Sequence, residues 1–278
     1  MSFGIPKAYG SYEDLLADPE IEAIYNPLPN HLHVPWSIRA AEAGKHVLCE
    51  KPISISLTDA RRLLAARDRT GVKMQEAFMI RTHPQWLGTL DMIRAGKIGP
   101  PRSIMGYFSF YNDDPTNIRN IREMGGGAVM DIGCYLVNTS RLIFAEEPRR
   151  VIAAFETDPQ TKVDRMTSMI LDYPSGQAIG TCSTQMTYYQ RVHIFGTRGH
   201  IEVQIPFNAP NNKPSQVFVN GETQEFATCD QYQIQGDLFS KAIRENTVVP
   251  IPLEDSVLNM KVIEALFRSA ESGTWEKP

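Results

Sequence analysis

Residues 21–52 read IEAIYNPLPNHLHVPWSIRAAEAGKHVLCEKP, and this stretch decides the fold class. Its two runs Ile21 to Tyr25 and Lys45 to Glu50 have the composition of strands. Between them, Val34 to Ala43 has helical spacing, and Gly44 follows as a stop signal. A strand, a helix and a second strand in this order are typical of a parallel, doubly wound sheet.

The same alternation continues on both sides of this stretch. Ser11 to Leu16 reads as a short helix, and Ser56 to Thr70 as a helix that Gly71 ends. Lys73 to Ala77 is a third strand-like run, and His83 to Arg94 is a further helix. The first hundred residues therefore predict a partial Rossmann-like domain, residues 1–100.

From Arg102 onward the pattern changes to a succession of strands with short turns, such as Tyr173 to Gly176. The predicted strands are Arg102 to Tyr111, Val151 to Glu156, Met166 to Asp172, Gln177 to Ser183, Arg191 to Phe195, His200 to Ile205 and Gln216 to Val219. The predicted helices are Gly127 to Phe144, Tyr232 to Glu245 and Glu254 to Ser272. We therefore predict an α/β protein whose second domain, residues 101–278, is an α+β unit with a large, mostly antiparallel open sheet.

Composition narrows the class of partner. The net charge is −4, and the 28 Lys and Arg residues are dispersed, so no basic stripe for nucleic acid is present. No apolar run approaches the roughly 20 residues that span a bilayer, and the first residues lack the pattern of a signal peptide. The four cysteines are scattered, which is typical of thiols in a reducing compartment. We expect a cytoplasmic protein that binds a small molecule.

Several residues are candidates for chemistry. Lys51 follows a strand and precedes a proline; its ammonium could stabilise a developing alkoxide, or it could be a solvated surface lysine. Asp131 and Tyr135 are four apart and would share one face of a helix. Asn30 and His33 are expected on the loop after the first strand, at the edge of the sheet where doubly wound folds bind ligands.

Three motifs, taken together, resemble the Gfo/Idh/MocA family of NAD(P)-dependent oxidoreductases. They are YNPLPNHLH at 25–33, EKP at 50–52 and GGGAVMDIGCY at 125–135, in the family's order. GTRG at 196–199 and the closing helix at 259–273 extend the likeness over the whole chain. At the position of Tyr135 other members of the family have His. With a tyrosine there, the chain is more similar to the glucose-fructose oxidoreductase, sugar dehydrogenase and dimeric dihydrodiol dehydrogenase branches.

The resemblance implies roles for particular residues. Lys51 and Tyr135 would move the proton, and Asp131 would bind substrate hydroxyls, with Lys51 as the cation that lowers the pKa of Tyr135. Asn138 would add a hydrogen bond to the substrate, although a packing role is equally open. The residues implied at the cofactor are Pro27, Asn30, His33, Glu50, Pro52 and Arg81. For His33 a structural hydrogen bond, and for Arg81 a surface position, are the alternatives.

The family's phosphate loop is not found in this sequence. Members that resemble it begin with a strand and a GxGxxG loop, and no GxGxxG occurs here. We expect a βαβ unit of roughly 50 to 65 residues to be missing relative to such members, and NAD(P) binding to be weak as a consequence. The sequence does not indicate NAD over NADP.

The predicted function is oxidation or reduction of a sugar, polyol or related carbonyl compound by hydride transfer. Two alternatives need no dinucleotide: hydrolysis of a lactone or ester, and a sugar-binding regulatory protein. No HExxH or GxSxG motif is present, so neither a metal site nor Ser/His hydrolysis is predicted. The outer face of the large sheet is a predicted surface for a homodimer or higher oligomer.

Overall fold

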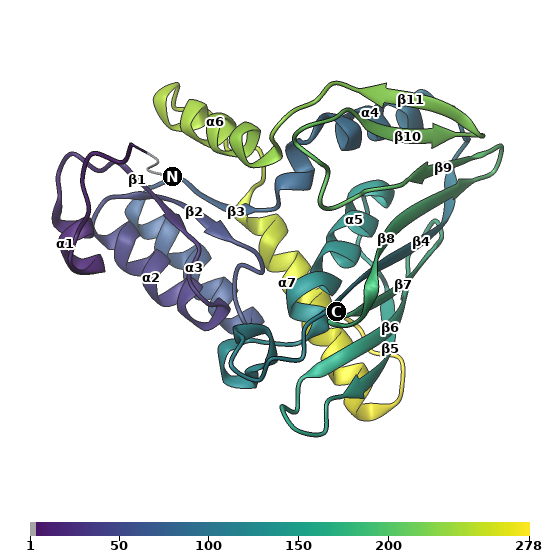
Figure 1. Ribbon diagram of the computed structural model, residues 1–278, viewed down its shortest axis with the longest axis horizontal. Coiled ribbons are helices and arrows are strands. Elements are labelled where there is room, and N and C mark those ends of the chain that lie inside the picture. The colour runs from purple at the N-terminus through teal and green to yellow at the C-terminus, as the bar shows by residue number, and fades with distance from the viewer. Residues whose placement is uncertain (1–3) are drawn as a thin grey trace.

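A computed structural model describes residues 4–278, and its first unit is a small parallel sheet (Figure 1). Strands β1 (Ala23–Asn26), β2 (His46–Glu50) and β3 (Met74–Ala77) lie in the order β1-β2-β3. Helices α2 (Asn30–Glu42) and α3 (Leu57–Thr70) connect them. The strand and helix alternation of the first hundred residues is thereby confirmed.

Local signals set the ends of these helices as the sequence predicts. α1 (Tyr12–Ala17) begins after Ser11, whose hydroxyl accepts a hydrogen bond from the backbone N–H of Asp14. α3 begins after Ser56 in the same way and ends at Gly71, which has a φ of 71°.

The start of α2 differs from the prediction. The helix begins at Asn30, so Asn30 and His33 lie in its first turns and not on a loop. The prediction started at Val34, where the helical spacing of apolar residues begins. The helix instead accommodates Pro35 in its second turn and forgoes the one N–H that proline lacks.

The second unit is an eight-stranded sheet in the order β11-β10-β9-β8-β4-β7-β6-β5. Every pair is antiparallel except β4 with β7. The mostly antiparallel open sheet is therefore confirmed. Its strands are β4 (Pro101–Tyr111), β5 (Arg150–Thr157), β6 (Asp164–Asp172), β7 (Gln177–Ser183), β8 (Gln185–Gly196), β9 (His200–Val203), β10 (Ser215–Val219) and β11 (Glu222–Phe226).

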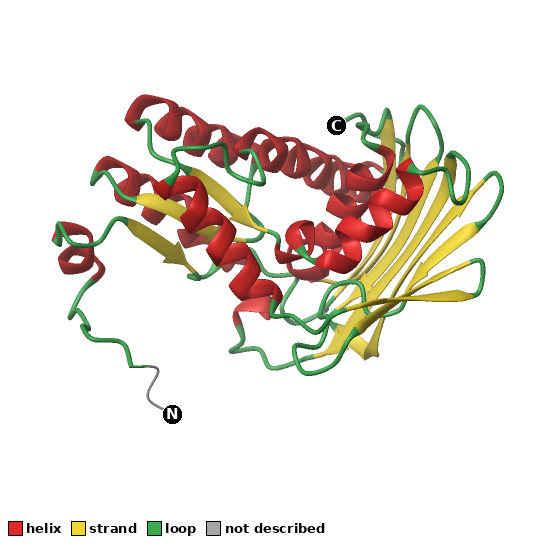
Figure 2. Cartoon of the chain, turned by 90° about the horizontal axis from the view of Figure 1, so that it is seen from above, coloured by secondary structure: helices red, strands yellow, loops and turns green. Residues whose placement is uncertain are grey.

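Helices cover one face of this sheet, and Figure 2 shows the other face bare within residues 4–278. α7 (Leu253–Ser272) lies between the two sheets and contacts β3 and α3 on one side, β5 and α5 (Cys134–Phe144) on the other. α4 (Pro84–Arg94) packs near β10 and β11, and α6 (Gln231–Arg244) packs on β2. No helix in this part of the chain combines the length and the apolarity needed to cross a bilayer.

Two glycines seat α5 on the sheet. Gly106 of β4 and Gly180 of β7 are partners in the parallel ladder. A Cβ on Gly106 would lie 2.7 Å from Leu136 Cδ2, and one on Gly180 would lie 3.0 Å from Leu136 Cδ1. Because these two positions have no side chains, Leu136 can approach the backbone of the sheet. This contact sets how closely α5, which contains Leu136, packs on the sheet.

Some details of the second unit were not predicted. β8 begins at Gln185, six residues before the prediction, β9 ends at Val203, and β11 was missed. The segment before α5 is a π-helical turn, η4 (Val129–Gly133), and not regular α-helix. The boundary between domains near residue 100 stays a prediction.

Candidate active site

Lys51 and Asp131 form an ion pair where the end of β2 meets η4. Lys51 Nζ lies 3.1 Å from Asp131 Oδ1 and 2.5 Å from the Asp131 backbone oxygen. Their side chains are 14% and 13% exposed, respectively. The peptide between Lys51 and Pro52 is cis. The structure therefore brings together the EKP triplet and the GGGAVMD segment, as the sequence predicts.

Arg119 completes the charge cluster from the loop between β4 and η4. Its Nε lies 2.8 Å from Asp131 Oδ2, so the two carboxylate oxygens face different cations. Burial would raise the pKa of Asp131, but the charges of Lys51 and Arg119 outweigh burial and lower it. Burial would likewise lower the pKa of Lys51, but Asp131 and other neighbours raise it. Both groups are therefore charged at neutral pH.

Tyr135 lies beneath this pair, with its hydroxyl turned away. Lys51 Nζ is 5.1 Å from the centroid of the Tyr135 ring, an arrangement suited to a cation–π contact. The hydroxyl donates to Met79 Sδ at 3.3 Å. Burial raises the pKa of Tyr135 well above 10. The expectation that Lys51 lowers this pKa is wrong for this arrangement, because the ammonium faces the ring and not the hydroxyl.

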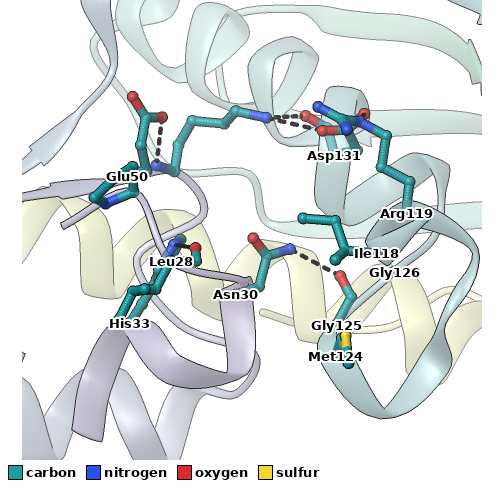
Figure 3. Close-up of a pocket in the computed structure, with 12 residues that line it drawn as sticks. Leu28, Asn30, His33, Glu50, Ile118, Arg119, Met124, Gly125, Gly126 and Asp131 are labelled. Carbon is teal, nitrogen blue, oxygen red and sulfur yellow. Dashed lines mark hydrogen bonds and ion pairs between the residues drawn. The ribbon is translucent and has the colours of Figure 1, made fainter. Parts of the chain in front are cut away.

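A first cavity of about 190 Å³ opens beside the pair on the side of α2 (Figure 3). Pro27, Asn30, His33 and Glu50, four of the residues predicted at the cofactor, line it. Figure 3 shows Asn30 directed across the cavity to Gly125, where its Nδ2 donates to the backbone oxygen at 2.8 Å. The amide thus joins the first unit to the glycine segment of the second.

His33 has structural partners on both sides of its ring. Its Nδ1 lies 2.8 Å from the Pro52 backbone oxygen and its Nε2 lies 2.6 Å from that of Leu28. Whichever nitrogen carries a proton donates to its carbonyl. Burial lowers the pKa of this imidazole. His33 therefore ties the loop after β1 to the EKP turn, which is the structural alternative, and it also lines the first cavity.

A second cavity of about 440 Å³ lies on the other side of the pair, toward the large sheet. Its wall combines aromatic rings, polar groups and the same charged cluster. It is lined by Tyr25, Glu50, Lys51, Phe108, Phe110, Asn112, Arg119, Asp131, Ile132, Tyr135, Asn208 and Tyr232. Glu50, Lys51, Arg119 and Asp131 line both cavities. The ion pair thus borders both cavities.

Three predicted site residues, Pro52, Arg81 and Asn138, line neither cavity. Pro52 follows Lys51 directly, and its backbone oxygen contacts His33. Arg81 pairs with Asp255 at the start of α7, at 2.8 Å, and lines neither cavity. Asn138 is fully buried in α5, and its side-chain nitrogen and oxygen have no hydrogen-bond partner among the described residues. Neither position reaches the ion pair, so a cofactor contact for Arg81 and a substrate contact for Asn138 remain unsupported predictions.

Sequence reasoning missed Arg119, Tyr25 and Tyr232. Arg119 lies in a single 3-10 turn, η2 (Ile118–Asn120), which is too short for a periodic pattern to indicate which side chain points inward. Tyr25 could have been found, since it ends a predicted strand, and its hydroxyl donates to Glu50 Oε1 at 2.5 Å. Tyr232 opens a helix far along the chain. Among residues 4–278, no group of three or more His, Cys, Asp or Glu side chains is placed to hold a metal ion.

Comparisons with known proteins give the chain its family. Residues 1–78 match a family model described as an oxidoreductase family with an NAD-binding Rossmann fold. Residues 88–202 match the GFO/IDH/MocA C-terminal domain. Neither match depends on the site geometry, and together they cover both units of the fold.

Individual relatives support the same family assignment. An uncharacterised oxidoreductase of Rhizobium meliloti is 50% identical over 284 residues, covering 99% of this chain and 85% of that protein. The NADP-dependent D-xylose 1-dehydrogenase 2 of Haloferax volcanii is 36% identical, covering 97% and 84%, respectively. A crystal structure of an aldose-aldose oxidoreductase from Caulobacter crescentus, with glycerol bound, is 28% identical with a TM-score of 0.89, covering 99% of this chain and 86% of that one. The chain belongs to the Gfo/Idh/MocA family of NAD(P)-dependent oxidoreductases.

Proposed function

We propose that this protein transfers hydride between NAD(P) and a hydroxyl-bearing carbon of a sugar, polyol or related carbonyl compound. The observation that carries the proposal is the Lys51–Asp131 ion pair, which stands between two cavities. A reaction between two bound molecules needs such an arrangement, with the charged groups beside the reacting atoms. The sugar and polyol class comes from the relatives, among them the D-xylose dehydrogenase and the aldose-aldose oxidoreductase.

Lys51 is the group that stabilises a developing alkoxide. An ammonium has three N–H donors, and two of them are directed to Asp131, at the backbone oxygen and Oδ1. The third is free for a ligand oxygen in either cavity. Because the pKa of Lys51 is raised, the group stays a cation throughout the neutral range. A fixed cation at this point favours the charged transition state over the neutral ground state.

Asp131 orients Lys51 and offers acceptors to hydroxyl groups. An ionised carboxylate has about four lone-pair sites, and Lys51 and Arg119 occupy one on each oxygen. The remaining sites can accept from substrate hydroxyls without breaking the cluster. Its lowered pKa keeps it an acceptor at neutral pH.

Tyr135 is suited to donate a proton. Its raised pKa keeps the phenol protonated, and its present acceptor, the thioether of Met79, is a weak one. A substrate oxygen in the second cavity is a better acceptor, so the hydroxyl can turn to it. We therefore assign Tyr135 as the acid in the reduction direction, with Lys51 as the adjacent cation.

The residues around the first cavity fit the nicotinamide end of NAD(P). The donor set there combines a cation, a carboxylate and an amide on rigid elements, namely Lys51, Glu50 and Asn30. When bound, the nicotinamide supplies or accepts the hydride. Residues 1–78 match a family model described as an NAD-binding Rossmann fold, which supports a dinucleotide site on this unit.

The test is a titration with NADH and NADPH, followed by nicotinamide fluorescence, with reduced nicotinamide mononucleotide as the matched probe. If the contacts are mainly at the nicotinamide end, the mononucleotide and NADH bind with similar, weak affinity. Turnover of an aldose panel that includes D-xylose should then require a high concentration of NAD(P). Hydrolysis of a lactone without NAD(P), or ligand-induced stabilisation without turnover, would contradict the proposal and favour cofactor-free chemistry or a binding protein.

We also propose that the protein is a homodimer joined by the bare face of the large sheet. Met105 of β4 and Ile179 of β7 are register partners on that face, 47% and 46% exposed, with His193 of β8 beside Met105. Exposed apolar side chains that lie next to each other on a sheet face are typical of an association surface.

The four free cysteines, three of them buried, support a reducing, cytoplasmic compartment.

A further inference from the structure

The ion pair depends on two backbone segments that come from different units of the fold. Lys51 lies just beyond β2, whose ladder with β3 ends at the pair Glu50 and Ala77. Asp131 lies in the π-helical turn, where the hydrogen-bond pattern is irregular. Regular secondary structure therefore does not fix the position of either residue completely. Other contacts must hold the backbone segments that carry Lys51 and Asp131.

Glu76 holds the segment that carries Lys51. It lies on β3, one residue before the end of the ladder, and is 1% exposed. Its Oε1 accepts a hydrogen bond from the backbone N–H of Ile53 at 2.8 Å. The side chain thus continues the ladder past its last backbone pair and fixes the turn two residues after Lys51.

Asp164 holds the segment that carries Asp131. It is the first residue of β6 and is 5% exposed. Its Oδ2 accepts from the backbone N–H of Val129 at 2.8 Å and from Thr167 Oγ1 at 3.0 Å. η4 has no side-chain cap from its own preceding residue, so this carboxyl serves as its cap. Gly127 makes room for it, since a Cβ there would lie 2.1 Å from Asp164 Oδ1.

We propose that Glu76 and Asp164 are positioning residues, which set the relative placement of Lys51 and Asp131 by fixing the backbone at Ile53 and Val129. The inference rests on the proposed function, since it concerns the same site. Burial raises the pKa of each carboxyl to about 7. Ionising either group at neutral pH therefore costs free energy, because the charge is removed from water. An apolar side chain would leave the backbone N–H of Ile53 or Val129 without its acceptor, whereas a side chain with an acceptor oxygen at this point fixes the backbone beside the site.

The test compares amide variants with apolar ones of similar size. Asp164→Asn and Glu76→Gln keep an acceptor for the backbone N–H, and Asp164→Leu and Glu76→Met remove it. We expect kcat to fall about 10²-fold in the apolar variants, with KM within roughly threefold of wild type, and the amide variants to stay close to wild type. Asp158→Leu is the control, because Asp158 also accepts from backbone N–H groups, but in the β5–β6 hairpin.

Coupling to Lys51 separates positioning from a general structural effect. In a Lys51→Ala background, the apolar variants should cause no further loss of kcat, because the group they position is gone. An equal further loss in that background would overturn the proposal. So would amide variants as impaired as the apolar ones. If the apolar variants do not fold, Asp164→Ser and Glu76→Ser replace them in the same comparison.

A readout without turnover keeps the two proposals apart. Lysine-selective ¹³C NMR follows the titration of Lys51, whose signal is assigned by its loss in Lys51→Arg. We expect the raised pKa of Lys51 to move toward its ordinary value in the apolar variants and not in the Asp158 control. A wild-type protein without NAD(P)-dependent turnover would refute the proposed function alone. An unchanged Lys51 titration in the variants would refute the positioning role.

Discussion

Lys51 Nζ and Asp131 Oδ1 lie 3.1 Å apart although 80 residues separate them in the sequence. Lys51 directly follows a strand of the parallel sheet, and Asp131 lies in a π-helical turn against the large sheet. The pair therefore exists only when both units are folded and docked.

Removing the cation should abolish most turnover. Lys51→Ala leaves Asp131 without its main buried partner and the alkoxide without a fixed cation. We expect kcat for NAD(P)-dependent turnover to fall about 10²- to 10⁴-fold. Steady-state kinetics at saturating NADPH checks this, with the exposed Lys97→Ala as the control. A loss below tenfold would assign the chemistry to another group.

Arg119 should affect binding more than chemistry. Arg119→Met frees Asp131 Oδ2, and the pKa of Asp131 should rise because one of the two cations that lower it is lost. We expect KM for a polyol to increase about tenfold with a smaller change in kcat, since a carboxylate with one fixed oxygen orients hydroxyls less well. Arg122→Met, in the same loop but exposed, is the matched control. Equal effects of the two variants would contradict a specific role.

Glu76 and Asp164 should make the protein less stable as pH rises toward 7. Burial raises their pKa values from 4.5 and 3.8 to about 7. Between these values the folded protein retains two protons that the unfolded chain releases, so the free energy of unfolding falls by roughly 1.4 kcal/mol per pH unit for each group. Above about pH 7 both are charged in either state, and this contribution becomes constant.

Urea unfolding between pH 5 and pH 8 measures this slope. Glu76→Gln and Asp164→Asn should each reduce the slope by roughly 1.4 kcal/mol per pH unit, because each removes one titrating carboxyl group. Asp158→Asn should leave the slope unchanged, because hydrogen bonds lower the pKa of Asp158 to about 2, outside the window. A slope that persists in the double variant would assign the protons to other groups.

The proposed dimer should separate when its patch is charged. Ile179→Glu places a carboxylate beside Met105 at the centre of the bare face, and burying two such charges against each other is unfavourable. We expect a monomer by sedimentation, with the fold retained. Leu87→Glu is the control, because Leu87 is equally exposed, at 46%, but lies on α4, one of the helices that pack on the sheet, and not on the bare face. A wild-type monomer at all concentrations would refute the proposal.

The sequence predicts the parts of this molecule that repeat a local pattern. Ser56 and Gly71 bound α3 because a cap and a left-handed residue are local requirements. The EKP turn after β2 follows from the strand pattern before it. Both are decided within a few residues, which is why they could be predicted.

The rest depends on contacts between distant segments. The start of α2 was placed wrongly because the helix begins at Asn30, after Pro29, without a side-chain cap that the sequence could have indicated. Arg119 reaches Asp131 from the single turn η2, and the Tyr135 hydroxyl turns to Met79 because of the surrounding core. No spacing in the sequence encodes such directions. Asn138 shows the same limit, since a buried position in α5 was indistinguishable from one facing the site.

The seating of Leu136 on Gly106 and Gly180 leaves only the thickness of one backbone layer between α5 and the outer face of the sheet. Tyr135 precedes Leu136 directly, and Met105 and Ile179 precede the two glycines. A change in the twist of these strands when a second subunit binds would therefore move the helix that carries Tyr135. If the proposed dimer forms, specific activity should therefore change with enzyme concentration over the range in which the subunits associate.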